Sequence, residues 1–424
     1  MKENLDVEKT EGAGMVKKAL LVTRVSGFIP QFEMNNVKIL QEMGYEVHYA
    51  ANFNTIVYGN DNSRLDGTGI IKHQVDFERS PFSKNVKISC KQLEELMTDE
   101  NFELIHCHMP MSGVVARIAA QRVRKKTGRK VPVLYTAHGL HFYTGAPFKN
   151  WIYYPIERYL ARYTDRLILI NDEDYKRAGK FPVRGKVEHT KGIGMNLSKY
   201  EKYQTDIERK DKRAIYKRFG IAEGSKIIVS VGELNKRKNH ICVIEAMAQL
   251  KDLDIVYLIC GTGAMEQELR SRVKDLGLEK KVIFAGYVKD VPDVLSECDC
   301  FVFPSFQEGL PVAVMEAMAV GLPVIASNIR GITDLIEHTK GGYLVHGFET
   351  VDYSVKIRRM FTEKDGKSAV PRKERREQMG MWNIEKVKEF SIEVVDRQMR
   401  KIYAEVTGEP RRRITLIDTF VIDQ

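Results

Sequence analysis

The sequence predicts an α/β protein made of two Rossmann-like, doubly wound domains that face a central cleft. Short apolar runs rich in branched residues alternate with longer amphipathic stretches along most of the chain. The series restarts after a polar, charged segment at residues 197–220. The first apolar run of each series also ends at a glycine. A chain of 424 residues is long enough to bury two separate cores.

The first series opens with a predicted strand at residues 17–25, followed by Ser26-Gly27. A helical stretch, FEMNNVKILQEMG, and a second strand, YEVHYAA, come next. Strand, glycine turn, helix and strand in this order are typical of a parallel sheet. The pattern continues with ELIHCH, the helix GVVARIAAQRVRKK, and the strands VPVLYTAHG and DRLILIN; KVEHTKGIG closes this half near residue 194.

The second series begins with the strand KIIVSVG and the helix HICVIEAMAQL. It continues with IVYLICGTG, MEQELRSRVKDLG and the further strands KVIFAG, CFVFPS and LPVIAS. After residue 350 the chain becomes helical and charged, and residues 390–406 carry apolar side chains at helical spacing. The predicted division is a flexible extension at 1–15, an N-terminal domain at 16–196, a C-terminal domain at 197–389, a helix at 390–408 and a tail at 409–424.

Composition and charge narrow the possible functions. The net charge of +10 fits anionic partners such as nucleotide phosphates or an acidic membrane surface, but no basic–aromatic repeat indicates nucleic-acid binding. The chain has no apolar run long enough to span a bilayer, and its first fifteen residues lack the apolar core of a secretory signal. The six cysteines form no C-x-x-C framework, so reduced thiols in the cytoplasm are expected.

Three short patterns resemble metal sites but are interpreted as structural. His106-Cys107-His108 has no further ligands nearby in the sequence. The D-x-D patterns at 172–174 and 252–254 are expected to be helix or loop charges. No metal ligand is therefore predicted.

The stretch PSFQEGLPVAVMEAMAVGLPVIAS, residues 304–327, carries the strongest functional signal. Its first strand ends at Pro304, and Pro311 fits the first position of the following helix. The free N–H groups at a helix start bind phosphates, and Gly309 would let the backbone approach them without a Cβ in the way. Glu316 lies roughly 7–8 Å further along the helix axis, where a ribose would follow a bound diphosphate. Its two carboxylate oxygens could accept both ribose hydroxyls.

This stretch resembles the E-x7-E motif of the large retaining GT-B glycosyltransferase family, of the group 1 or family 4 type. SVGELNKRKNH, CGTGAMEQELRSRVKDLGLEKKVIFAGYV and TAHGLHFY resemble further segments of that family. SPFSKN, IHCHMPMSGVVARIAAQRVRKK and NWIYYPIERYLARYTD resemble its capsule and exopolysaccharide branch. The resemblance runs from about Lys17 to Tyr403. It implies the GT-B fold, with the C-terminal helix returning to the N-terminal domain.

The resemblance also implies roles for individual residues. Glu308 would contact the transferred hexose, and Lys238 would neutralise the diphosphate. His138 would lie across the cleft, near the donor sugar and the acceptor hydroxyl. The remaining nucleotide-sugar contacts would come from Glu316, Gly309, Leu310, Pro311, Arg237, Asn235, Gly286, Tyr287 and Gly27. Glu233 stands where the family has an arginine, so Arg237 and Asn235 are candidates for the missing phosphate contact, and Glu233 is expected to turn away, toward Arg237. Asp334 stands where the family often has glutamate.

The expected activity is transfer of a hexose from a nucleotide diphosphate sugar, of UDP type, to a lipid-linked or saccharide acceptor in bacterial surface polysaccharide synthesis. No cofactor is expected, since the nucleotide sugar is a substrate. Retention could follow front-face attack or double displacement. An epimerase or phosphorylase on the same fold, or an inactive partner subunit, are the alternatives.

The lipid-linked acceptor places the protein at the inner face of the cell membrane as a peripheral protein. Residues 123–130 and 150–163 combine basic with apolar or aromatic side chains, which suits an anionic bilayer surface. The basic run at 123–130 is expected near the acceptor side of the cleft.

Overall fold

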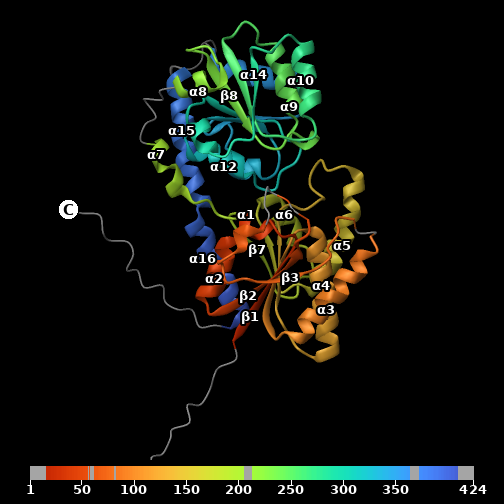
Figure 1. The fold of residues 1–424 in the computed structure, drawn as a ribbon. Helices are drawn as coiled ribbons and strands as arrows, with labels where there is room; N and C mark the ends of the chain where they lie inside the picture. The colour runs from red at the N-terminus through yellow and green to blue at the C-terminus, as the bar shows by residue number, and fades with distance from the viewer. Residues whose placement is uncertain are drawn as a thin grey trace, which may run out of the picture.

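The computed structural model describes residues 16–55, 57, 62–80, 83–204, 213–362 and 372–408. The extension predicted at 1–15 and the tail predicted at 409–424 lie outside these residues. Within them the chain forms two α/β domains, one above the other in Figure 1, each with a parallel sheet between helices. The predicted fold class is confirmed.

The N-terminal domain contains a parallel sheet with the strand order β3-β2-β1-β4-β5-β6-β7. Its strands are β1 (Lys17–Val25), β2 (Tyr45–Asn52), β3 (Ile71–Gln74), β4 (Phe102–His108), β5 (Val133–Ala137), β6 (Arg166–Leu169) and β7 (Lys186–His189). Its helices are α1 (Phe28–Phe32), α2 (Met34–Glu42), α3 (Asn85–Asp99), α4 (Pro110–Thr127), α5 (Tyr153–Leu160) and α6 (Asp172–Ala178). The strand order reverses between β1 and β4, where doubly wound sheets bind ligands.

Successive side chains of β1 point to opposite faces of the sheet, and both faces are covered by helices. Leu20 and Val22 pack into the core cluster that contains Val115 of α4. Ala19 and Leu21 point the other way, into a second cluster with α2. A strand buried on both faces reads as a continuous apolar run, which is why this strand was recognisable in the sequence.

The C-terminal domain repeats the arrangement with the strand order β10-β9-β8-β11-β12-β13. Its strands are β8 (Lys226–Val231), β9 (Ile255–Cys260), β10 (Val282–Gly286), β11 (Cys300–Phe303), β12 (Val324–Ser327) and β13 (Gly342–Val345). The helices from the connecting segment onward are α7 (Glu201–Gln204), α8 (Arg213–Phe219), α9 (His240–Ala248), α10 (Glu266–Asp275), α11 (Val291–Ser296), α12 (Val312–Ala319), α13 (Ile332–Leu335), α14 (Thr350–Phe361) and α15 (Arg372–Val387).

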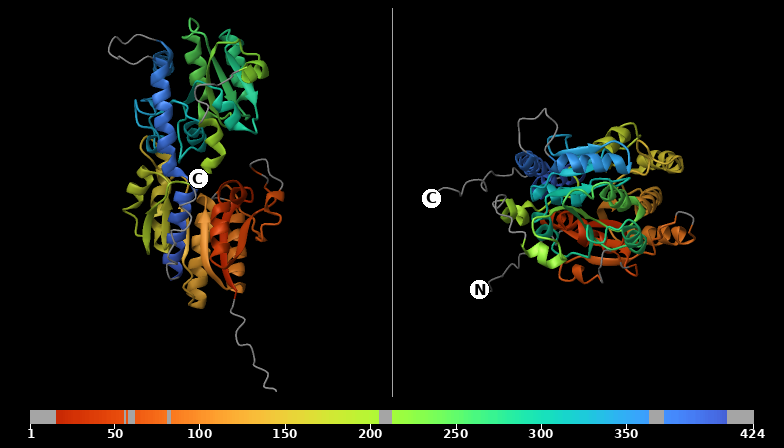
Figure 2. Two further views of the ribbon diagram at one scale, coloured as in Figure 1. Left: turned by 90° about the vertical axis from the view of Figure 1, so that its left-hand side faces the viewer. Right: turned by 90° about the horizontal axis from the view of Figure 1, so that it is seen from above.

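The chain crosses between the domains twice, and the two crossings lie side by side. Met195 N–H donates to Phe390 O at 2.9 Å, and Ile392 N–H donates to Met195 O at 2.8 Å. The final helix α16 (Ile392–Thr407) then runs along the N-terminal domain (Figure 2). Its residues Met399 and Tyr403 join the core cluster of β1 and β2. The predicted return of the C-terminal helix is therefore confirmed.

The structure corrects three local predictions. The helix expected over FEMNNVKILQEMG is divided between α1 and α2, with Glu33 at the junction. Pro311 is the N-cap residue of α12 and not its first helical residue. The basic run at residues 124–130 does not lie beside the cleft, because α4 starts after the carboxyl end of β4 and runs back to the opposite edge of the sheet. Arg129 of this run instead donates to the carbonyls of Met97 and Thr98, at the end of α3.

Candidate functional site

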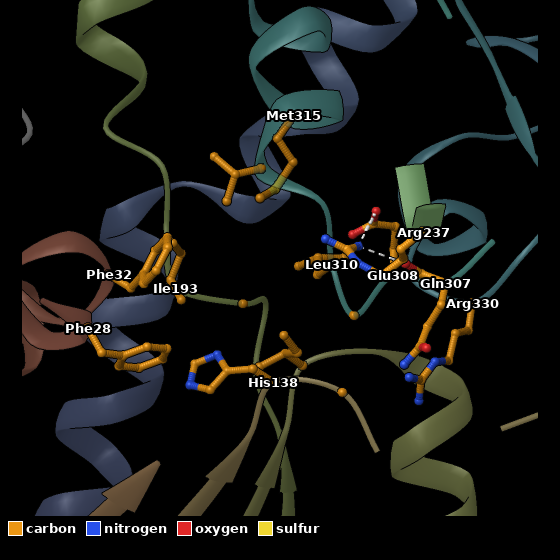
Figure 3. Close-up of a pocket in the computed structure, with 15 residues that line it drawn as sticks. Phe28, Phe32, His138, Ile193, Arg237, Gln307, Glu308, Leu310, Met315 and Arg330 are labelled. Carbon is orange, nitrogen blue, oxygen red and sulfur yellow. Dashed lines mark hydrogen bonds and ion pairs between the residues drawn. The ribbon is translucent and has the colours of Figure 1, made fainter. Parts of the chain in front are cut away.

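A cavity of about 320 Å³ lies between the carboxyl edges of the two sheets (Figure 3). From the N-terminal domain it is lined by Phe28, Phe32, His138, Gly139, Ile170, Gly192 and Ile193. From the C-terminal domain it is lined by Arg237, Gln307, Glu308, Gly309, Leu310, Val312, Met315 and Arg330. Of the predicted site residues, His138, Arg237, Glu308, Gly309 and Leu310 thus meet at one cavity between the domains. Its size is in the range of small-molecule sites.

The turn at Gly309 touches the opposite domain. A Cβ at Gly309 would lie 2.0 Å from the carbonyl oxygen of His138, and a Cβ at Gly331 would lie 2.1 Å from Gly309 O. The sequence predicts only that Gly309 lets the backbone approach a phosphate. The structure adds a second requirement, because no side chain fits at Gly309 while the domains remain this close.

Two cations converge on Glu308. Its Oε1 accepts from Lys238 Nζ at 2.8 Å and from Arg237 Nη1 at 2.7 Å. Glu308 and Lys238 are nearly buried, with side chains 8% and 11% exposed. Burial lowers the pKa of Lys238, and the attraction of Glu308 opposes that shift. The group therefore carries one more positive than negative charge next to the start of α12, which suits a phosphate.

Glu233 does not turn toward Arg237, which corrects that expectation. Its carboxylate accepts from the side-chain amide of Asn235 at 2.8 Å. Asn235 in turn caps the short helical turn at residues 236–238 by accepting from Lys238 N–H at 3.1 Å. Arg237 is free of Glu233 and pairs with Glu308 because the turn places both on the same side of the cleft.

Glu316 lies on α12 behind the turn, where it accepts from the hydroxyl of Tyr200 at 3.2 Å. Burial raises the pKa of Glu316 above its ordinary value. Tyr200 comes from the segment that connects the domains, and sequence reasoning missed it. The tyrosine orients the carboxylate, and the second carboxylate oxygen remains to accept another hydroxyl.

His138 follows β5 and reaches the cavity from the N-terminal side, with the Phe28 ring 5.0 Å away edge-on. Its Nε2 lies 3.2 Å from His108 Nδ1 and 3.4 Å from Glu33 Oε1. Among the described residues, two groups have donor atoms that lie close enough together to hold a metal ion. One is Glu33, His108 and His138, and the other is Asp172, His189 and Asp334.

The other predicted residues, Lys238, Glu316, Asn235, Pro311, Gly27, Gly286 and Tyr287, are not part of the cavity lining. Gly27 caps α1, directly before Phe28. Gly286 ends β10 with a positive φ of 66°, and Tyr287 after it is 79% exposed. The D-x-D residues take protein partners: Asp252 pairs with Arg358, and Asp174 is buried against Arg330.

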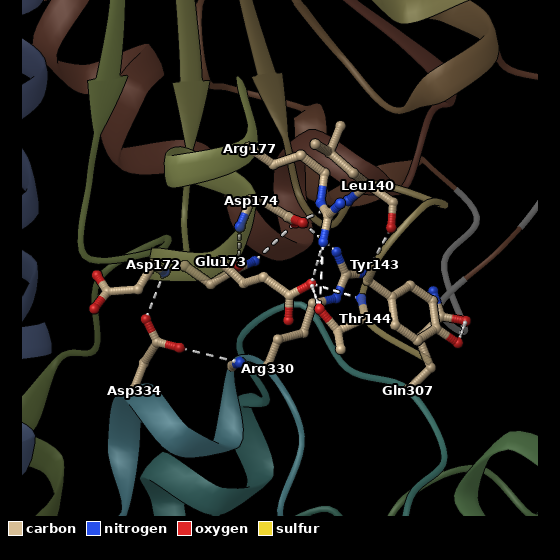
Figure 4. Close-up of polar contacts among 12 residues, drawn as sticks. Leu140, Tyr143, Thr144, Asp172, Glu173, Asp174, Arg177, Gln307, Arg330 and Asp334 are labelled. Atoms are coloured by element: carbon tan, nitrogen blue, oxygen red, sulfur yellow. Dashed lines mark hydrogen bonds and ion pairs between the residues drawn. The ribbon is translucent and has the colours of Figure 1, made fainter. Parts of the chain in front are cut away.

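Arg330 joins the two domains, and no pattern in the sequence predicts this role (Figure 4). It is 5% exposed, donates to the Asp174 carboxylate and donates to Leu140 O at 2.6 Å. Its guanidinium also lies 4.5 Å from the centre of the Tyr143 ring. Asp334 strengthens the same junction by accepting from Asp172 N–H at 2.7 Å. A contact between residues 156 positions apart leaves no periodic trace in the sequence.

Glu33 was also missed, although a signal for it exists. It precedes the buried residues Val37 and Leu40 by four and seven positions, which is the spacing of one helix face. Burying a carboxyl group on an apolar helix face destabilises the fold unless the group has a hydrogen-bonding partner, so an acid there indicates a partner or a function.

Comparison with known proteins identifies the family of the chain. The family model described as glycosyl transferases group 1 matches residues 211–380, and the glycosyl transferase 4-like domain matches residues 34–187. EpsD of Bacillus subtilis, named as a glycosyltransferase, is 34% identical over 351 residues, which cover 82% of this chain and 88% of EpsD.

Two further proteins are similar to this chain. The UDP-Gal:alpha-D-GlcNAc-diphosphoundecaprenol alpha-1,3-galactosyltransferase of Escherichia coli is 31% identical over 60% of this chain and 65% of its own length. The crystal structure of HepE of Anabaena in complex with UDP and glucose superposes with a TM-score of 0.69 at 18% identity. It covers 92% of this chain and 100% of HepE, which shows the GT-B fold. Together with the identity to EpsD over most of both chains, these matches show that the protein is a glycosyltransferase and belongs to the group 1 glycosyl transferases.

Proposed function

We propose that the protein is a retaining hexosyltransferase that moves a sugar from a UDP-sugar to a lipid-linked saccharide in surface polysaccharide synthesis. The observation that supports this most is the pairing of Lys238 and Arg237 with Glu308 at the start of α12, opposite His138. The activity for which the Escherichia coli relative is named, galactosyl transfer from UDP-Gal to a diphosphoundecaprenol-linked sugar, supports the donor and acceptor classes.

The geometry suggests how the reaction is assisted. The bond between the anomeric carbon and the β-phosphate oxygen breaks, and an acceptor hydroxyl forms the new bond on the same face. Lys238 and Arg237 stabilise the negative charge that grows on the departing diphosphate, which is the type of interaction that lowers the barrier most. In front-face attack, the departing phosphate takes the acceptor proton. These cations act without a metal or other cofactor.

The direct test is incubation with UDP-hexoses and a prenyl diphosphate-linked sugar, with NMR of the product to determine its anomeric configuration. Transfer with retention that persists in EDTA is expected. Inversion, or complete loss of transfer in EDTA with recovery on adding a divalent ion, would contradict the proposal. Epimer formation from the UDP-hexose alone, or phosphate-dependent turnover, would identify the alternative enzyme classes.

The Glu316→Gln variant should bind UDP about 10- to 100-fold more weakly, because a charged hydrogen-bond acceptor is worth on the order of 1.5–3 kcal/mol. Since burial raises the Glu316 pKa, wild-type affinity should also fall on acidification at a higher pH than an ordinary glutamate would give. The variant should lack that fall. Calorimetry measures both effects, with the exposed Glu268→Gln on α10 as control. Unchanged UDP affinity in folded Glu316→Gln would remove the ribose assignment.

We further propose that the protein docks on an anionic membrane through the segment 148–163, which includes α5. Phe148, Ile152 and Tyr159 are 93%, 63% and 54% exposed. Lys149, Arg158 and Arg162 are exposed beside them, and the segment's single acid, Glu157, is buried against Arg117. Such a face combines apolar insertion with attraction to anionic lipid.

This surface, unlike the basic run on α4, adjoins the candidate site. The ring of Tyr153 lies 4.9 Å from that of His141, three residues after His138. Among the described residues, no helix is both long and apolar enough to cross a bilayer. Docking through α5 would place the cleft near a lipid-linked acceptor.

Replacing Phe148, Ile152 and Tyr159 by serine should abolish most co-sedimentation with vesicles that contain anionic lipid. Wild-type binding should weaken with salt, because each cation near the surface contributes about 1 kcal/mol that is screened within a Debye length. The matched control replaces the similarly exposed Val351 and Val355 of α14. Equal binding by both variants, or equal binding of wild type to neutral vesicles, would reject this docking surface.

A further inference from the structure

A buried polar group lies behind His138 on the N-terminal side of the cavity. Glu33, at the junction of α1 and α2, is 3% exposed and His108, at the end of β4, is fully buried. Glu33 Oε1 lies 3.4 Å from His138 Nε2 and 3.6 Å from His108 Nδ1. His108 Nδ1 is within hydrogen-bond distance of His138 Nε2, at 3.2 Å. Both neighbours therefore approach the same nitrogen of His138.

The other nitrogen of His138 is left for the cavity. Among the described residues, Nδ1 of His138 has no hydrogen-bond partner, and the side chain is 22% exposed (Figure 3). A neutral imidazole carries one proton, so the partner of Nε2 decides what Nδ1 offers to a substrate. If Nε2 accepts a hydrogen bond, Nδ1 carries the proton.

We propose that His108, which donates to Nε2, and the neutral Glu33 beside it hold His138 in the tautomer with its proton on Nδ1, so that the ring presents an N–H donor to the nucleotide sugar. Glu33 is then a positioning residue that acts as a neutral carboxylic acid. This inference rests on the proposed function. It specifies which hydrogen-bonding atom His138, opposite Glu308 and Lys238, presents to the substrate.

The surroundings of both neighbours favour this arrangement. The second nitrogen of His108, Nε2, is buried and has no hydrogen-bond partner among the residues that the structure describes. Leaving an unprotonated Nε2 unpaired at this position costs less free energy than leaving a buried N–H without an acceptor. The His108 proton therefore belongs on Nδ1, which can donate to His138. Among the described residues, no cation pairs with Glu33 to hold a carboxylate. Asn36 of α2 donates to its Oε2, and His108, His138 and Tyr403 of α16 are its other polar neighbours.

The charge state of Glu33 agrees with that geometry. Burial raises the pKa of Glu33 to about 8, so the acid is neutral at pH 7 and ionises as the pH rises through that value. Burial also lowers the pKa of His138 to about 4, so the ring is neutral at pH 7. Once ionised, the Glu33 carboxylate can only accept hydrogen bonds. Its Oε1 would accept from His108 Nδ1–H and from His138, whose proton would move to Nε2.

The test is a pH series of 15N spectra of the full chain with labelled histidine, with the His138 signal assigned from its loss in His138→Gln. The Nδ1–H tautomer is expected at pH 7, with conversion to Nε2–H around pH 8. In Glu33→Gln, whose amide N–H mimics the protonated acid, the Nδ1–H form should persist to higher pH. Glu103→Gln, an exposed acid on β4, should behave as wild type.

Activity provides the second readout. Wild-type kcat should fall above pH 8, as Glu33 ionises and the tautomer of His138 changes. Glu33→Gln should keep kcat within about threefold of wild type at pH 7 and should not show this fall. An Nε2–H tautomer in wild type at pH 7, or a Glu33→Gln variant as inactive as His138→Gln, would overturn the proposal, because the carboxylate would then be required. Stoichiometric zinc that is lost in Glu33→Gln would also overturn it. Failure to transfer any sugar would refute the proposed function and leave the tautomer measurement standing.

Discussion

The Lys238→Ala variant is expected to lose about two to three orders of magnitude in kcat/KM with a nucleotide sugar, the range found when one charge-stabilising donor is removed. Its ammonium group is held against Glu308 and lies 4.4 Å from the centre of the Phe303 ring, so its position is fixed before the substrate binds. A fixed charge in a largely water-excluded site stabilises the developing charge without reorganisation. The fold should persist, because Arg237 still pairs with Glu308.

Binding measurements separate this role from a general loss of affinity. Uridine should bind Lys238→Ala as tightly as wild type, whereas UDP should bind more weakly, since Lys238 acts on the diphosphate. Lys236→Ala is the matched control, because Lys236 is exposed on the same helical turn. Equal losses of affinity for uridine and for the UDP-sugar would show that Lys238 supports the nucleoside site or the local fold.

Much of the fold was predictable because its strands are buried on both faces. β1, β5, β8 and β9 are continuous apolar runs that end near glycine or a polar turn, and each was recognised. β3 was missed, since its four residues IKHQ are largely exposed and carry no apolar period. β13 was missed as well, because its four residues begin at Gly342 and are too short to show a pattern.

The site was predictable where a local motif carries it. One stretch of chain contains Glu308, Gly309, Leu310 and the N-terminus of α12. The structure brings this stretch to the cavity together with His138. The interdomain contacts were not predictable, since each depends on how two separately folded sheets meet. The acceptor-side position of the basic run was wrong for a topological reason: a helix that follows a parallel strand carries its end away from the ligand edge.

The Arg330→Met variant is expected to open the cleft and to lose both stability and activity. Arg330 and Asp174 are a buried ion pair between the domains, with side chains 2% and 0% exposed. Asp174 is also held within its own domain, because its Oδ2 accepts from Leu140 N–H and from the Asn171 amide, each at 2.9 Å. Removing Arg330 alone leaves this carboxylate uncompensated, which costs about 3–5 kcal/mol if the domains stay closed.

Separation of the domains would hydrate Asp174 and relieve that cost, so an increased radius of gyration by small-angle scattering is the expected structural signature. Denaturant unfolding should show lower stability, and kcat should fall because His138 and Glu308 no longer face each other. The double variant Arg330→Met/Asp174→Asn should regain most of the stability, since the amide oxygen can keep the local hydrogen bonds without the buried charge. Arg358→Met is the control, because its pair with Asp252 is exposed to solvent and contributes little to stability. If Arg330→Met matches Arg358→Met in stability and in radius of gyration, the contact does not hold the domains together.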